Sequence, residues 1–231
     1  MSRGARPWIE ATTGYWQEFT PADAHHAPPY RYGYPARLPD GRVLVLPIRP
    51  VPGAGDRAVA SLIANQASFA VIDGLAQCMA ELARPLAAEC VIGLPTLGQV
   101  FASPVAALLG HRRSVPFGYS RKFWYDERLS VKLRSLTTPD AAKRAYLDPN
   151  QLALVAGRRV LVVDDAASTG STLAGVLPLL ESLGAQIAGV VVAMLQSDAW
   201  RETLGARAHL VRGVISSPRL ELREDGWYPA S

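Results

Sequence analysis

The central part of the chain alternates short, nearly unbroken apolar runs with segments of helical periodicity. The apolar runs predict strands. They cover residues 90–94, 114–117, 158–163 and 187–195. Apolar residues three and four positions apart predict helices over residues 57–86, 100–109 and 171–183. Strands without polar alternation are buried on both faces, so the pattern predicts an α/β fold with a doubly wound, mostly parallel sheet.

Both ends of the chain and one internal segment depart from this alternation. The first 40 residues are rich in proline and aromatic residues and predict an irregular arm, followed by a strand at residues 42–48. The polar and basic segment 118–157 is longer than most connections, and such segments are usually lids or disordered. We therefore expect an N-terminal arm, a core with a flexible lid, and a C-terminal tail. The expected bounds are 1–56 for the arm, 57–206 for the core, 118–150 for the lid and 207–231 for the tail.

Composition narrows the class of protein. The chain has 231 residues, 49% of them hydrophobic and 19% charged, which excludes disordered, collagen-like and coiled-coil proteins. No apolar run approaches the roughly 20 residues of a membrane-spanning helix, and no signal-peptide pattern is present, so we expect a cytoplasmic protein. Cys78 and Cys90 are too few for a disulfide framework, and we expect Cys90 to fill the core. The net charge of +4 suits a small polyanionic ligand as well as nucleic acid.

Candidate chemistry is concentrated in one stretch, Val160 to Thr172, with the sequence VLVVDDAASTGST. Four apolar residues predict a buried strand, and Asp164 and Asp165 follow at its carboxyl end, where open α/β sheets bind their ligands. The next residues form a loop that opens a helix: Ala166, Ala167, Ser168, Thr169, Gly170, Ser171 and Thr172. Backbone N–H groups at a helix N-terminus, with free hydroxyls, suit a phosphate group. The two acids could accept hydrogen bonds from a sugar diol or hold Mg²⁺ through water.

This stretch resembles the phosphoribosyl pyrophosphate (PRPP) motif of the type I phosphoribosyltransferases. That motif has four apolar residues, two acids, three small variable residues and Thr-Gly-x-Thr, with Ser171 standing here at the usual second glycine. A strand ending in acidic helix-capping residues is the alternative, although capping alone does not explain two acids before Thr-Gly-x-Thr. The resemblance, closest to adenine-type purine enzymes, implies a type I phosphoribosyltransferase fold. It also implies a pentosyltransferase that transfers 5-phosphoribosyl from PRPP to a nucleobase, a purine being favoured, with release of pyrophosphate and with Mg²⁺ as cofactor.

The resemblance assigns roles to further residues. It implies that Asp164 and Asp165 act in catalysis and hold the metal through water, and that residues 166–172 bind the 5′-phosphate. The segment after the first core strand looks like the loop that wraps the pyrophosphate: Leu94, Pro95, Thr96, Leu97 and Gly98. An ordinary strand–helix turn explains that segment equally well.

The expected lid supplies candidate cations. Arg121 and Lys122 resemble the basic pair that begins the catalytic loop of adenine-type members, and we expect them to reach the departing pyrophosphate as the lid excludes water. A solvated run of charges is the alternative. Lys132 and Arg134 are further candidates, and Leu195, at the end of the last predicted strand, is the candidate for contact with the base.

In this family an appendage called the hood selects the base, and we expect the arm, the strand at 42–48 and the tail to form it. No recognition pattern in these segments identifies the base. We expect PRPP and a small nucleobase as partners, no membrane or nucleic acid, and a homodimer, the common state of family members. The second hypothesis is a non-catalytic, PRPP-sensing regulator that binds nucleic acid. The positive charge permits it, but no helix-turn-helix pattern precedes the core.

Overall fold

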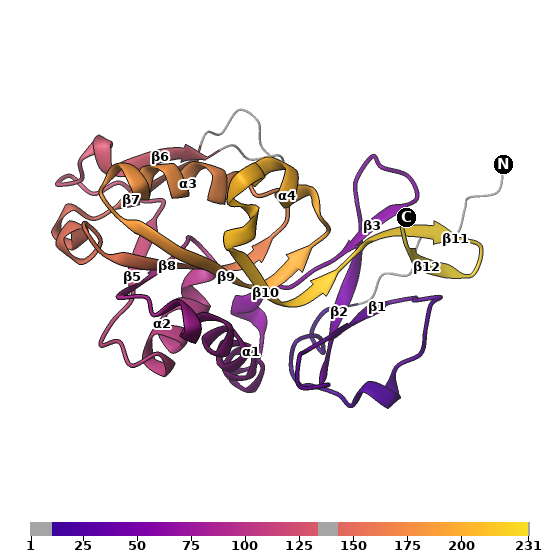
Figure 1. The fold of residues 1–231 in the computed structure, drawn as a ribbon. Helices are drawn as coiled ribbons and strands as arrows, with labels where there is room; N and C mark the ends of the chain where they lie inside the picture. Colours follow the sequence, from indigo (N-terminus) through magenta and orange to yellow (C-terminus); the bar gives the residue numbers. More distant parts are fainter. Residues whose placement is uncertain (1–10, 134–142, 231) are drawn as a thin grey trace.

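The computed structural model describes residues 11–133 and 143–230, which fold around two sheets (Figure 1). The larger sheet has seven strands in the order β10–β9–β8–β4–β5–β7–β6. These strands are β4 (Cys90–Gly93), β5 (Val115–Gly118), β6 (Ser130–Leu133), β7 (Lys143–Leu147), β8 (Arg159–Ala167), β9 (Gln186–Gln196) and β10 (Val211–Ser217). The five from β10 to β5 are parallel, whereas β7 runs antiparallel to both β5 and β6.

Helices cover both faces of the larger sheet, as the apolar strand pattern requires. Helices α1 (Phe69–Ala83) and α2 (Gly98–Leu108) lie on one face, and α3 (Ser171–Ser182) and α4 (Ala199–Leu204) on the other (Figure 1). Successive side chains of β8 point to opposite faces, so Leu161 packs in the α1–α2 cluster and Val162 in the α3 cluster. The α/β, doubly wound, mostly parallel architecture is therefore confirmed.

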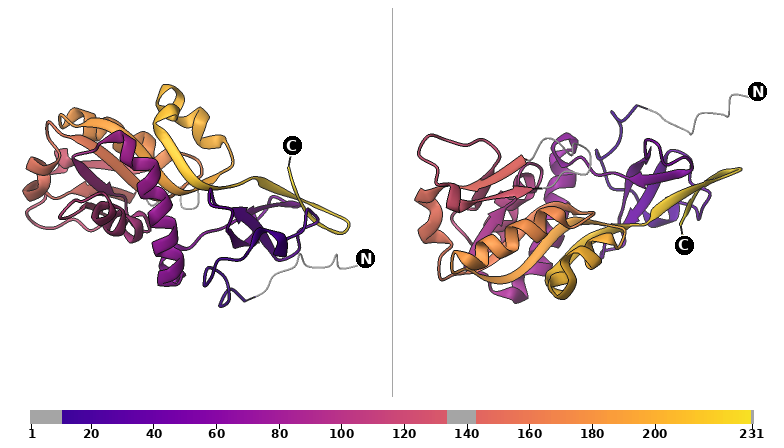
Figure 2. Two further views of the ribbon diagram at one scale, coloured as in Figure 1. Left: turned by 60° about the horizontal axis from the view of Figure 1, so that its bottom comes forward. Right: turned by 90° about the horizontal axis from the view of Figure 1, so that it is seen from above.

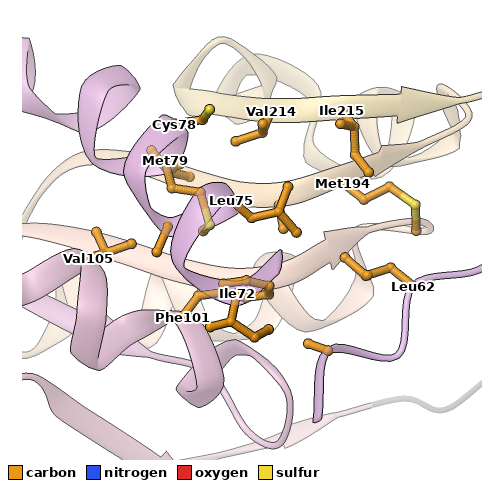
Figure 3. Close-up of a cluster of buried hydrophobic side chains, with 14 of the residues drawn as sticks. Leu62, Ile72, Leu75, Cys78, Met79, Phe101, Val105, Met194, Val214 and Ile215 are labelled. Atoms are coloured by element: carbon orange, nitrogen blue, oxygen red, sulfur yellow. The ribbon is translucent and has the colours of Figure 1, made fainter. Parts of the chain in front are cut away.

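The α1–α2 face contains the larger hydrophobic cluster. Leu75 and Met79 of α1 and Phe101 of α2 are fully buried against the middle of the sheet (Figure 3). The cluster continues through Met194 at the end of β9 to Leu62, in the segment that leads out of the smaller sheet. One apolar core thus holds the carboxyl end of β9 in place relative to helices α1 and α2.

The smaller sheet joins the two ends of the chain in the order β1–β2–β3–β11–β12 (Figure 2). Its strands are β1 (Gly33–Arg37), β2 (Val43–Pro50), β3 (Arg57–Ala60), β11 (Arg219–Arg223) and β12 (Gly226–Pro229). We call this sheet the hood. Its strand β1 lies within the arm that was expected to be irregular. The hood also differs from the expected division of the chain, because it takes β3 from the core while β10, expected in the tail, pairs with β9.

The prediction of a helix from residue 57 was wrong at its start. Residues Arg57–Ala60 form β3, whose side chains alternate between exposed and buried, and α1 begins only at Phe69. The Ser68 hydroxyl caps the helix by accepting a hydrogen bond from the Val71 N–H at 3.2 Å. Within the segment 57–86, which was predicted to be helical, only the second half contains an α-helix.

The long insertion is also more regular than its polar composition suggested. Its strands β6 and β7 form an antiparallel pair that extends the larger sheet beyond β5. Val131 and Leu133 alternate with the polar residues Ser130 and Lys132 on β6, and an added Cβ on Gly175 of α3 would lie 3.3 and 3.2 Å from the Val131 and Leu133 side chains. The apolar period of two is short and interrupted by charges, which is why the segment was expected to be a lid throughout. Residues 134–142 of that expected lid lie outside the described residues.

Both cysteines are buried free thiols, which confirms the expected core position of Cys90. Burial raises the pKa of the Cys90 thiol to about 11. In the part of the chain that the structure describes, no helix has the length and apolar character needed to cross a bilayer.

Candidate active site

The two acids stand at the carboxyl end of β8, as the sequence predicts. Asp164 is only 7% exposed, and its Oδ1 accepts a hydrogen bond from the Asp165 N–H at 2.9 Å. Among the described residues, neither acid forms an ion pair with a basic side chain. Burial and then the neighbouring Asp165 raise the pKa of Asp164 well above its usual range, and burial raises that of Asp165. The fold therefore keeps two desolvated carboxyl groups without a cation of its own.

The predicted phosphate loop is shorter than expected, because Ala166 and Ala167 still belong to β8 and pair with Met194 and Leu195 of β9. Residues 168–170 make the turn into α3. The Thr169 and Ser171 hydroxyl oxygens lie 3.0 Å apart, and the Ser171 N–H donates to Thr169 Oγ1 at 3.4 Å. Helix α3 begins at Ser171, and the N–H groups of a first helical turn have no partner within the helix. Together with the hydroxyls they form a cluster of donors at the positive end of the helix dipole, which suits a phosphate group.

Gly170 gives this turn its shape. Its φ is +76°, in the left-handed region, and an added Cβ would lie 3.1 Å from both the Cα and the carbonyl oxygen of Trp200. The backbone of α4 therefore lies against the loop, and only glycine fits without displacing one of them.

We expect Gly170→Ala to weaken PRPP binding, because the loop must shift away from Trp200. The left-handed strain alone should also lower the free energy of unfolding by roughly 1–2 kcal/mol. Gly157→Ala is the matched control, since Gly157 has a φ of +72° with nothing within 4 Å of the added Cβ. Thermal unfolding should show the destabilisation of left-handed strain in both variants, with Gly170→Ala at least as destabilised as Gly157→Ala, and titration calorimetry should show weaker PRPP binding only in Gly170→Ala. Equal PRPP affinity in the two variants would contradict this role.

The predicted pyrophosphate loop lies beside the acids, because β4 and β8 are adjacent parallel strands. The Leu94 N–H donates to the Val163 carbonyl at 3.0 Å, and the Pro95–Thr96 peptide is cis. An ideal Cβ on Gly98 would lie 2.7 Å from Asp164 Oδ1. The segment from Leu94 to Gly98 thus bends around the first acid and places its backbone within reach of a ligand bound there.

Tyr119, which was not among the residues predicted from the sequence, lies beside this loop. Its hydroxyl donates to the Pro95 carbonyl at 3.0 Å. Burial, followed by the charges of Asp164 and Asp165, raises its pKa, so the phenol stays protonated and able to donate. The Lys143 ammonium lies 5.4 Å from the centre of its ring. Tyr119 directly follows β5, and a polar residue at the end of a core strand was the signal that could have identified it.

We expect Tyr119→Phe to raise the KM for PRPP roughly two- to tenfold, because the Pro95 carbonyl loses a hydrogen bond of about 0.5–1.5 kcal/mol. The matched control is Tyr228→Phe, which removes a hydroxyl that donates to Asp225 in the hood at 3.1 Å. Steady-state kinetics of the two variants should separate them. An unchanged KM in Tyr119→Phe would show that this contact does not position the loop.

The match to a family model decides the identity of the fold. The model of the phosphoribosyl transferase domain matches residues 58–213, which is more than half of the chain. The chain belongs to the phosphoribosyltransferase family. The resemblance drawn from the motif and the expected enzyme class are both confirmed.

Named relatives and a solved structure cover 63–74% of this chain. An adenine phosphoribosyltransferase of Streptomyces coelicolor is 31% identical over 173 residues, which cover 73% of this chain and 85% of that protein. One from Parafrankia sp. is 33% identical over 149 residues, covering 63% and 73% respectively. The crystal structure of APRTase from Giardia lamblia complexed with 9-deazaadenine superposes with a TM-score of 0.59 at 21% identity, covering 74% of this chain and 93% of that one. This last similarity shows the shared fold.

The cationic and base-binding candidates of this phosphoribosyltransferase contact residues other than the two acids. Arg121 forms an ion pair with Glu127 at 3.0 Å, and the Lys122 carbonyl accepts from the Tyr125 N–H at 3.0 Å. Lys132 is exposed on β6, and Arg134 lies outside the described residues. Leu195 pairs with Ala167 in the β8–β9 register and packs so closely on Gly213 that an added Cβ there would lie 2.4 Å away. Their functional roles stay predictions.

The acid pair fits a cation that brings most of its own ligands. Within residues 11–133 and 143–230, no three His, Cys, Asp or Glu side chains are grouped to hold a metal ion. Mg²⁺ takes six oxygen ligands and usually keeps several waters, so two carboxylates suit a cation also bound by substrate oxygens. A cation next to Asp164 and Asp165 would favour their charged forms, which burial alone disfavours.

Proposed function

We propose that the protein transfers a 5-phosphoribosyl group from PRPP to a purine base, adenine being the first candidate, and releases pyrophosphate. The observation that carries this proposal is the meeting of three elements at one edge of the sheet. The acid pair, the donor-rich turn before α3 and the loop 94–98 lie at the carboxyl ends of β4 and β8. Adenine is proposed because the relatives described above carry adenine phosphoribosyltransferase names.

In this proposal the residues 166–172 bind the 5′-phosphate, remote from the bond that breaks. That binding energy holds the anomeric carbon in position. Asp164 and Asp165 accept hydrogen bonds from the ribose hydroxyls. As the bond from the anomeric carbon to the pyrophosphate oxygen breaks, positive charge develops on the sugar, and the carboxylates stabilise it. A base nitrogen then forms the new bond to the same carbon and releases its proton to solvent or to the departing pyrophosphate.

The leaving pyrophosphate gathers negative charge, which backbone N–H groups of the loop 94–98 are placed to receive. When bound, Mg²⁺ would neutralise part of the charge on the pyrophosphate oxygens. Arg121 and Lys122 keep their proposed role as cations of the lid, although Arg121 lies against Glu127 here. Lys143, through its position over Tyr119, is a further candidate cation beside this loop.

Pyrophosphate release across a panel of bases tests the proposal. The enzyme should release pyrophosphate from PRPP with adenine present, and a blank without base should release none. Pyrophosphate release with another base alone would support the phosphoribosyltransferase activity but exclude adenine as the acceptor base. No pyrophosphate release with any base, together with salt-sensitive binding to nucleic acid, would favour the regulator hypothesis. The relatives described above do not support that hypothesis. A homodimer and a cytoplasmic location stay predictions.

A further inference from the structure

A cavity separates the phosphate loop from the hood. Its volume is about 410 Å³, and the core lines it with Ser168 and Thr169 of the loop and with Gln196 at the end of β9. The hood lines the other side with Arg57 of β3 and Arg219 of β11. The Gln196 amide donates to the Ala60 carbonyl at 2.8 Å and so ties β3 to the core beside this cavity.

The strand register gathers three arginines on one face of the hood. Val59 pairs with Arg49 on β2 and with Arg219 on β11, so these three residues form a row across the sheet. Arg57 lies two residues from Val59 on β3 and therefore projects to the same face. The opposite face, with Ala58 and Leu220, is buried in the hydrophobic cluster of the hood. Arg57, Val59 and Arg219 of the arginine-bearing face line the cavity, which Ala58 of the opposite face also borders, whereas Arg49 lies beside the lining residues in the register.

These three guanidinium groups lack a protein counterion. Among the described residues, none of Arg49, Arg57 and Arg219 forms an ion pair. Glu221 lies opposite Arg57 in the register, but its carboxylate is paired with Arg223. Positive charge thus accumulates where the donor-rich loop already favours an anion, and like charges held together without a partner are unfavourable. A bound anion removes that cost.

We infer that this cavity is an anion-binding site shared by the phosphate loop and the hood, in which the hood arginines Arg57 and Arg219, flanked by Arg49, hold a phosphate or carboxylate of the ligand lying against Ser168 and Thr169. Arginine is suited to this because its planar fork donates two parallel hydrogen bonds to either group. The anion has two possible sources, the 5′-phosphate of PRPP or an acidic substituent on the acceptor base. The identity of these ligands rests on the proposed function, whereas the site itself rests on the cavity and the register.

The test is titration calorimetry with the double variant Arg57→Gln, Arg219→Gln. The matched control is Arg112→Gln, Arg113→Gln, which removes the same charge from the exposed connection between α2 and β5. The probes are PRPP, ribose 5-phosphate and inorganic phosphate, and steady-state KM values compare orotate, which carries a carboxylate, with neutral adenine. The hood variant should bind an anionic probe roughly ten- to hundredfold more weakly than wild type, as loss of charged hydrogen bonds predicts, while the control stays within twofold. Circular dichroism of both variants checks that the hood remains folded.

The outcomes distinguish the 5′-phosphate from an acidic base substituent as the source of the anion. They also distinguish failure of the inferred site from failure of the proposed function. Equal weakening of PRPP and ribose 5-phosphate assigns the arginines to the 5′-phosphate, and a raised KM for orotate alone assigns them to the acceptor. Unchanged affinity for every probe in a folded hood variant overturns the inference and leaves the proposed function intact. If wild type binds phosphate but not PRPP, and the hood variant loses phosphate, the proposed function fails and the inference stands. If no probe binds wild type, both fail.

Discussion

Replacing Asp164 and Asp165 together by asparagine should lower kcat/KM by roughly 10²–10³-fold while leaving the fold intact. Removal of one group that stabilises transition-state charge typically has an effect of this size. Asparagine keeps the shape of each side chain but removes the negative charge that would face the developing cation on ribose. Asp73→Asn, on the exposed face of α1, is the control and should keep wild-type kinetics.

The same double variant should unfold at a higher temperature than wild type at neutral pH. Burial raises the pKa of both carboxyls in the folded state, so their ionisation opposes folding. The folded protein holds more protons than the unfolded chain at pH values between the unfolded pKa, about 3.9, and the raised folded pKa. Stability therefore falls as pH rises through that window, and the advantage of the variant should grow over the same window. Thermal unfolding from pH 4 to pH 8 measures this, and a variant less stable than wild type would contradict the account.

Gly98→Ala should damage the site through contact with the backbone. An ideal Cβ would lie 2.8 Å from the Asp164 Cα and from the Val163 carbonyl oxygen, and neither atom can move without moving β8. We expect the free energy of unfolding to fall by about 1–3 kcal/mol, the usual cost of overpacking, and PRPP turnover to fall with it. Denaturant unfolding and steady-state kinetics measure the two effects.

Gly14→Ala is the control for this substitution, because an added Cβ there has nothing within 4 Å. It should match wild type in stability and turnover. If Gly98→Ala behaves like Gly14→Ala, then the loop 94–98 and Asp164 are not in the close contact that the account requires.

The apolar runs of the sequence predicted the parallel strands well because burial on both faces leaves little room for polar residues. The run at 187–195 became β9, Gln186–Gln196, with one residue added at each end. The acid pair and the phosphate loop were also predictable, because the residues that form them are consecutive in the sequence. The close approach of Gly98 to Asp164 was not predicted, because these distant residues meet only through the pairing of β4 with β8.

Features that depend on strand register could not be predicted from the sequence alone. Arg49, Arg57 and Arg219 come from both ends of the chain, and only the pairing of β2, β3 and β11 shows that they share a face. Strands β6 and β7 were missed because their apolar runs are short and lie beside charged residues, Lys132 on β6 and Lys143 and Arg144 on β7, which weaken the apolar signal. Strand β3 was assigned to a helix because its two apolar alternations are too short to distinguish the two periods.

A crystal structure of the protein with ribose 5-phosphate bound tests the central claim most directly. The account predicts that the phosphate lies against the backbone N–H groups and hydroxyls of Ser168 to Thr172, with the ribose hydroxyls donating to Asp164 and Asp165. A phosphate bound away from this turn, with both acids free of the sugar, would contradict it.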